Sequence, residues 1–86
     1  MVSLREKRQI KAMYATIKKL GCCTASDIQS DNGNMSISTF NKLKPYLMDE
    51  YEGRMEYRRD RKLFIDLHPD EVMQDQIQEI LEKYQS

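Results

Sequence analysis

The chain has 86 residues, a length that indicates one small domain over residues 1–86. A domain of this size buries only about 60% of the surface that its unfolded chain exposes, so its core has little stability in reserve. Hydrophobic residues make up 40% and charged residues 33% of the sequence, which favours an ordered domain over a disordered segment. No apolar run approaches the ~20 residues of a membrane span and no signal-peptide pattern opens the chain, so we expect a cytoplasmic protein without a membrane partner.

The net charge is zero, but the charges are distributed unevenly along the chain. Residues 1–65 contain 13 Lys/Arg and 8 Asp/Glu, whereas residues 66–86 contain one Lys and six Asp/Glu. Such asymmetry is a better guide to partners than the total charge, because a basic face keeps its field if the acidic segment folds away from it. The composition is therefore compatible with an anionic partner.

Two helices are predicted in the first third of the chain. Ser3, with an acidic residue three positions later, forms a capping-box pattern before a helical repeat of apolar residues, and Gly21 is a natural stop. These signals predict a helix over residues 4–20. Thr24 repeats the capping pattern and predicts a short helix over residues 25–31.

A turn and a third helix follow. The segment Asp31–Asn34 is rich in residues that tolerate positive φ, which predicts a turn. Ser36 or Ser38 can cap the next helix. Its apolar stripe consists of Ile37, Phe40, Leu43 and Leu47. Pro45 lies inside this stripe and removes one helical hydrogen bond, so we expect a bend or an early end near Lys44.

The apolar pattern then changes to a period of two, which predicts a two-stranded hairpin. Met55 and Tyr57 alternate with charged residues, as do the apolar residues of the segment Leu63–Leu67. The segment between the two strands is strongly charged. Its cations are Arg58, Arg59, Arg61 and Lys62.

A last helix is predicted over residues 69–85. Pro69 fits the first helical position, and the acidic residues that follow it suit the positive end of the helix dipole. Its apolar stripe consists of Met73, Ile77, Ile80, Leu81 and Tyr84. Two interpretations of this stripe remain open: it packs on the core of its own chain, or it pairs with a second copy of the chain.

The order helix, short helix, Gly-containing turn, helix and basic hairpin over residues 4–67 resembles the winged helix-turn-helix proteins. The resemblance implies a mainly α domain with a small β-hairpin, an α+β fold. The added helix over residues 69–85 is similar to the pairing helix of small dimeric regulators of this group, which implies a homodimer. In these proteins the third helix enters the major groove of double-stranded DNA, and the hairpin touches phosphate or the minor groove. By position, the contact residues are Ser36, Ser38, Thr39, Asn41, Lys42, Lys44, Arg58, Arg59, Arg61 and Lys62.

The chemistry of these residues supports backbone contact more directly than base reading. Arginine matches phosphate with a rigid fork of donors, although a charged turn also keeps an edge strand from aggregating. Asn41 can read adenine through a bidentate pair. However, the third helix lacks the Arg or Gln that its counterparts use to read bases, and Asp49, Glu50 and Glu52 follow it closely.

Two further groups of residues have alternative uses. Tyr57 and Phe64 lie beside the cations and can stack on unpaired bases if they are exposed. Phe64 points to the side opposite to its neighbours in the strand. The alternative is that Phe64 belongs to a small apolar cluster. The first helix carries a run of cations that can be a solvated face, although Arg8 and Lys11 are also placed to contact phosphates or the acidic helix of a second subunit.

Catalysis has little support in the sequence. His68 is the only histidine and precedes a proline at a joint, and no second histidine is present to form a base-and-orienter pair. A disulfide between the adjacent Cys22 and Cys23 would be strained, and their spacing is not that of zinc ligands. We expect both to be buried thiols in a reducing compartment. We therefore expect no catalytic residue, metal or cofactor.

Three functions fit these observations. The first is a small transcriptional regulator that binds double-stranded DNA, of the kind carried by viruses, plasmids or mobile elements. The second is a single-stranded DNA-binding accessory protein of replication or recombination that uses Tyr57 and Phe64. The third is a winged-helix protein-interaction module or inhibitor without nucleic-acid affinity.

Overall fold

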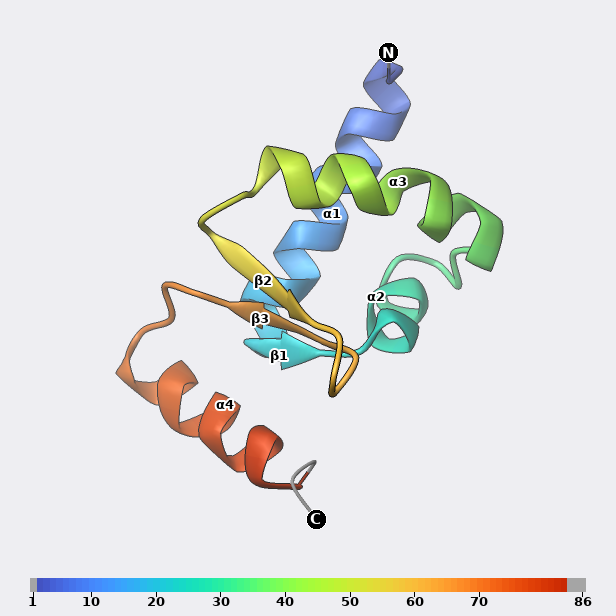
Figure 1. Cartoon of the computed structure of the whole chain (residues 1–86). Helices are drawn as coiled ribbons and strands as arrows, with labels where there is room; N and C mark the ends of the chain where they lie inside the picture. Colours follow the sequence, from blue (N-terminus) through green and yellow to red (C-terminus); the bar gives the residue numbers. More distant parts are fainter. Residues whose placement is uncertain (1, 84–86) are drawn as a thin grey trace.

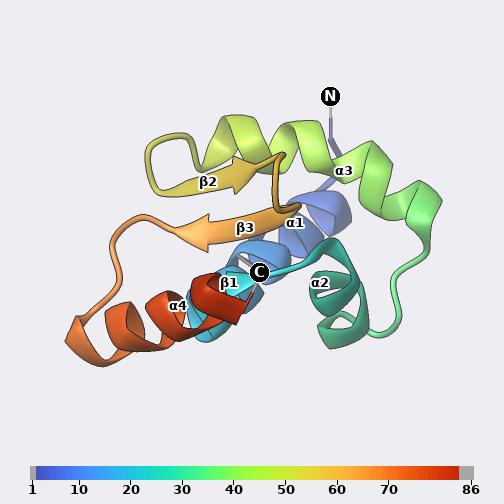
Figure 2. The same ribbon diagram turned by 60° about the horizontal axis from the view of Figure 1, so that its bottom comes forward.

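The computed structural model describes residues 2–83, which form four helices and a three-stranded antiparallel sheet, a mixed α+β architecture (Figure 1). The elements in chain order are α1 (Leu4–Leu20), β1 (Cys22–Cys23), α2 (Ala25–Asp31), α3 (Ile37–Glu50), β2 (Met55–Arg58), β3 (Leu63–Asp66) and α4 (Glu71–Lys83). In both views α3 and α4 lie on opposite sides of the sheet (Figures 1 and 2). Within residues 2–83, no helix combines the length and hydrophobicity that crossing a bilayer requires.

The first two helices begin and end where the sequence predicts. The Ser3 side chain accepts a hydrogen bond from the backbone of Glu6, whose carboxylate accepts one from the Ser3 backbone, and Thr24 and Asp27 form the same reciprocal pair before α2. Gly21 ends α1 at a φ of 76°, in the left-handed region that glycine tolerates best. Local capping chemistry therefore fixes these boundaries.

The third helix differs from its prediction in two ways. It begins after Ser36, whose side chain accepts from the Thr39 backbone, and it continues through Pro45 to Glu50, so the expected early end near Lys44 is wrong. Pro45 lies on the exposed side of the helix, while Leu43 and Leu47 on the opposite side are fully buried and hold both halves on the core. Ile37 does not join the buried stripe, because at the first helical position it is 69% exposed.

The sheet contains a strand that no sequence pattern predicts. Cys22 and Cys23 form β1, which pairs with β3 and gives the strand order β1–β3–β2. Two residues are too few to show an alternating pattern in the sequence, and β1 is recognised as a strand only by its pairing with β3. Its backbone continues the ladder from Gly21, whose carbonyl accepts a 2.8 Å hydrogen bond from the Asp66 amide.

The main core lies between the sheet and helices α1, α2 and α3. Met13, Ile17, Ile28, Leu43 and Leu47 are completely buried there. Phe64 is completely buried in the same cluster, with its ring centroid 6.1 Å from that of Phe40 in an edge-on arrangement. Of the two uses that the sequence leaves open for Phe64, the structure shows the apolar cluster, because α3 covers the sheet face to which the ring points.

The last helix covers the other face of the sheet. Ile77 is buried in a second cluster with Cys22, Leu63 and Ile65. Three partly buried residues of α4 pack against this cluster: Met73, Ile80 and Leu81. These four residues pack on the sheet of their own chain, and pairing with a second copy through the same stripe stays a prediction; Tyr84 lies outside the described residues.

The helix α4 also begins later than predicted. It starts at Glu71 instead of Pro69, and the Asp70 carboxylate accepts a 2.8 Å hydrogen bond from the Met73 backbone in the manner of an N-cap. The strand before it ends at Asp66, and Leu67, which the alternating pattern assigned to the strand, is 41% exposed.

Two buried polar groups fasten other elements to α1. Thr16 is 1% exposed; its hydroxyl lies 2.7 Å from the Asp31 carboxylate and accepts from the Asn32 amide, which holds the end of α2. Asp66 is 3% exposed and accepts from Lys18, 3.1 Å away, which holds the end of β3. Each pairing satisfies a group that would be costly to bury alone.

Candidate nucleic-acid interface

The hairpin tip presents four cations in a short stretch, and we call residues 58–62 the wing tip. Arg58 ends β2 and the next four residues form the turn, in which Lys62 adopts a φ of 56° before β3 begins. This left-handed residue closes a tight turn with no Asn-Gly or Asp-Gly pair, which explains why the sequence left its register open. Arg59 and Lys62 are exposed, and Arg61 is half-buried.

The acidic residues near the wing tip compensate its charge only weakly. Arg58 pairs with Glu56 at 3.4 Å, and Arg61 lies 3.8 Å from Asp60. Both acidic partners are exposed, so water competes with each contact, and such pairs contribute little. Within residues 2–83, no carboxylate lies within ion-pair distance of Arg59 or Lys62, so the wing tip keeps a net positive charge.

The wing tip and α3 are joined through the side of the sheet that faces α3. Tyr57 and Phe64 point to this side, and the Lys44 ammonium lies 4.0 Å from the centre of the Tyr57 ring. Arg58 is next to Tyr57 in the strand, so its side chain points to the opposite side of the sheet.

The predicted contact residues of α3 do not all face solvent. Ser38 and Asn41 are exposed on the outside of the first two turns. Thr39 is half-buried, and its hydroxyl accepts a 2.9 Å hydrogen bond from Ser36, so it belongs to the helix cap. Of the short polar side chains that the resemblance places against DNA bases, only Ser38 and Asn41 are thus exposed and free of the helix cap.

The two lysines of α3 have partners inside the chain. Lys42 forms a 2.8 Å ion pair with Glu6 at the start of α1. The hydrogen bond from Lys42, aided by the Ser3 amide, lowers the pKa of Glu6 to about 2, and the same contact raises the pKa of Lys42. Lys44 lies over Tyr57 in a cation–π contact. Neither contact was predicted, because each joins residues far apart in the sequence.

The second half of α3 is not basic. Its exposed residues are Pro45, Tyr46, Asp49 and Glu50. A shallow groove of about 500 Å³ separates this half from β2, and Asp49, Glu52 and Glu56 contribute carboxylates to its lining. Any cationic contact of α3 with an anion is therefore confined to its N-terminal half.

In comparisons with known proteins, no family model, curated protein or solved structure matches this chain.

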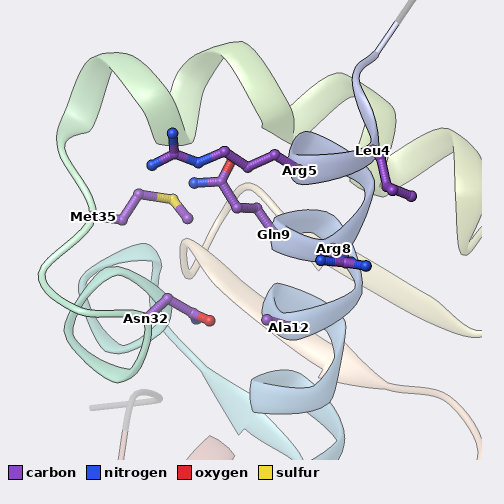
Figure 3. Close-up of a pocket in the computed structure, with 7 residues that line it drawn as sticks. All are labelled: Leu4, Arg5, Arg8, Gln9, Ala12, Asn32 and Met35. Atoms are coloured by element: carbon purple, nitrogen blue, oxygen red, sulfur yellow. The ribbon is translucent and has the colours of Figure 1, made fainter.

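A hollow of about 530 Å³ between α1 and the segment before α3 is a weaker candidate site. It is lined by Leu4, Arg5, Arg8, Gln9, Ala12, Asn32 and Met35. Figure 3 shows Arg5 reaching across toward Met35, whereas the Arg8 guanidinium points away from it. The Asn32 amide donates to Thr16 and to the Ile28 carbonyl. Because the two arginines diverge and the amide is engaged, the hollow does not converge on a ligand.

The residues weighed for catalysis have structural partners. Cys22 and Cys23 are buried and unbonded to each other, and burial raises the pKa of both thiols, that of Cys23 to about 12. The position of Cys22 and Cys23 before α2 therefore does not activate either thiol. A His68 ring nitrogen lies 3.1 Å from the Gly53 carbonyl, and its backbone amide donates to Asp66, as expected for a residue at a joint.

Proposed function

We propose that this protein is a small winged-helix protein that binds double-stranded DNA and regulates transcription, with the N-terminal half of α3 and the wing tip as its contact surface. The observation that carries the proposal is the wing tip, where four cations face two weakly bound carboxylates. Arginine and lysine at the end of a hairpin suit the phosphate backbone, which supplies most of the affinity of such interfaces.

The arrangement of the elements supports a winged-helix assignment. A short strand follows α1, two helices precede the hairpin, and this strand joins the sheet beside the second strand of the hairpin. This is the connectivity expected of a winged helix-turn-helix domain. The proposal is made for a single subunit, because the apolar stripe of α4 is used within the chain.

The acidic helix leaves the wing tip accessible to an anion. The helix α4 packs on β1 and the far side of the sheet, and within residues 2–83 no ion pair joins it to residues 58–62. The negative segment therefore does not cancel the basic surface by direct contact, as the proposal requires.

Base stacking beside the wing tip is disfavoured by the burial of its main candidate residue. Phe64 is completely buried, and Tyr57 is covered on one side by Lys44. Double-stranded DNA bound by its backbone is thus favoured over single-stranded DNA at this surface.

The proposal predicts a strong effect of the triple variant Arg58→Ala, Arg59→Ala, Arg61→Ala. Removing one cation that neutralises a phosphate reduces the slope of log affinity against log salt by about 0.9 in magnitude, so the triple variant should lower it by up to about 2.7. Fluorescence anisotropy with a labelled duplex over a range of salt concentrations measures this slope.

The matched control removes the same charge elsewhere, by the exposed changes Arg5→Ala, Lys7→Ala and Lys83→Ala. We expect the control to keep most of the native affinity and slope. Equal losses in the two triple variants would show that only total charge matters, and unchanged binding by the wing variant would refute the proposed surface.

A further inference from the structure

A second basic hollow lies between α1 and the segment that joins α3 to β2. It has a volume of about 640 Å³ and is lined by Lys11, Tyr14, Ala15, Lys18, Lys19, Tyr51 and Arg54. Four of these seven residues are cations, two are tyrosines and none is acidic. None of them belongs to the surface proposed above. We call this group the α1 hollow.

The fold holds the walls of the α1 hollow in place. Three wall residues recur at helical spacing on the outer side of α1, namely Lys11, Ala15 and Lys18. The opposite wall is attached by Tyr51, whose ring stacks on Tyr14 at 3.9 Å with the planes only 4° apart. The backbone of Arg54 donates to the Tyr51 carbonyl and accepts from the Leu67 amide, so its position is fixed at both sides.

The cations of the α1 hollow are only partly compensated. Lys18 pairs with Asp66 and Lys19 pairs with Asp31, and both lysine side chains remain about half exposed, at 45% and 59%. Within residues 2–83, no carboxylate lies within ion-pair distance of Lys11 or Arg54. The site therefore retains two uncompensated cations.

The tyrosine in the wall acts as a neutral donor. Burial, together with the nearby Glu50 and Tyr14, raises the pKa of Tyr51, and Arg54 opposes this rise. The Tyr51 hydroxyl therefore stays protonated at neutral pH and does not add a negative charge to the hollow. Two carboxylates, Asp49 and Glu50, line a neighbouring groove that also includes Tyr51 and Lys11, and neither of them lines the α1 hollow.

We propose that the α1 hollow binds phosphate groups of a nucleic-acid strand, with Lys11 and Arg54 as the main contacts. The Arg54 guanidinium supplies a planar fork for phosphate oxygens, and Lys11 supplies a point charge across the hollow. The small Ala15 leaves room between them. A cation that is already paired with a carboxylate must lose or weaken that ion pair when it binds phosphate, whereas an unpaired cation loses none. Lys18 and Lys19 are paired, so we expect them to contribute less to phosphate binding than Lys11 and Arg54.

The position of the α1 hollow allows one DNA molecule to reach both surfaces. Arg54 directly precedes β2 and the wing tip follows it, and Figure 2 shows the two turns at opposite ends of this strand. Four residues of strand span roughly 13 Å, which corresponds to the rise of about four base pairs. The inference rests on the proposed function only for the identity of the polymer that carries the phosphates.

The test is the double variant Lys11→Ala, Arg54→Ala, compared with Arg5→Ala, Lys83→Ala as a charge-matched control. All four residues are exposed, so each variant should unfold at the same denaturant concentration as the native protein. In anisotropy titrations with a labelled duplex, the double variant should lower the magnitude of the salt slope by up to about 1.8, and the control should not. Unchanged binding by the double variant would overturn the inference.

Combination with the wing variant separates the two proposals. If the wing variant loses binding while the hollow variant does not, the proposed function stands and the inference about the α1 hollow fails. If only the hollow variant loses binding, the α1 hollow is upheld and the wing surface is refuted. Losses in both variants support both proposals.

Two further arms identify the occupant. At constant ionic strength, inorganic phosphate should compete far more weakly than unlabelled duplex; equal competition would indicate a free-phosphate site and overturn the assignment to a polymer. Light scattering without DNA should give the same molar mass for the native and hollow variants. A mass that falls in the hollow variant would indicate that the acidic α4 of a second copy occupies the hollow, which also overturns the inference.

Discussion

Replacing Phe64 with alanine is expected to reduce the free energy of unfolding by about 3–5 kcal/mol, because it empties a completely buried aromatic site. Phe64 lies on the central strand and contacts two aromatic rings, those of Phe40 and Tyr57. The loss would consume a large part of the stability of so small a domain. Urea unfolding followed by circular dichroism measures it.

Two companion variants keep this prediction decisive. Tyr46→Ala removes an aromatic ring that is 42% exposed, and it should cost far less than the change at Phe64. Phe64→Leu retains most of the apolar volume and should fold even if the alanine variant does not, with a smaller loss. A loss below about 1 kcal/mol for Phe64→Ala would mean that the ring is not in the core.

Replacing Gly21 with alanine is expected to displace α4 from the sheet. Gly21 adopts a φ of 76°, and a Cβ there would contact the Met73 sulfur and lie 2.8 Å from Cγ1 of Ile77. The backbone conformation alone costs a non-glycine residue about 1–2 kcal/mol, and overpacking adds about 1–3 kcal/mol. The combined loss should appear in the free energy of unfolding.

Gly33 provides a matched control for this experiment. It has a similar φ of 70°, but a Cβ there would meet no atom within 4 Å. Gly33→Ala should therefore show the backbone cost without the packing cost, and the difference between the two variants reports the close approach of α4. Equal losses for the two glycines would contradict the packing of α4 on the sheet.

The parts of the fold that the sequence predicted are those determined by local chemistry. The capping pairs of Ser3 and Thr24 and the stop at Gly21 act within a few residues, and the helices begin and end at these positions. The two hairpin strands form where the two-residue alternation predicts them, although all four residues of β3 are buried. Such signals need no knowledge of distant partners.

The features that the sequence left open, missed or predicted wrongly concern contacts between distant segments. Phe64 alternates like an exposed residue, but α3 covers the face it points to. The stripe of α4 has the same pattern whether it meets its own sheet or a second chain, and the two-residue strand β1 has no pattern to detect. Pro45 favours an early end locally, but the burial of Leu47 keeps the helix intact.

The candidate site likewise has parts that are local in the sequence and were predicted, and contacts between distant residues that were not. The cations of the wing tip are adjacent in sequence and were found directly. The pairings of Lys42 with Glu6 and of Lys44 with Tyr57 join separate elements, and so does the approach of Arg54 to Lys11 across the α1 hollow. The arrangement in space, and not the composition of the sequence, decides which cations remain available.

The central claim is that the wing tip and the first two turns of α3 contact the same DNA duplex. Titration of the ¹⁵N-labelled native protein with a duplex at low salt tests it directly by NMR. We expect the largest amide shifts in residues 38–42 and 58–62, while the amides of α4 stay in place. Largest shifts on α4, or no shifts at all at low salt, would contradict the account.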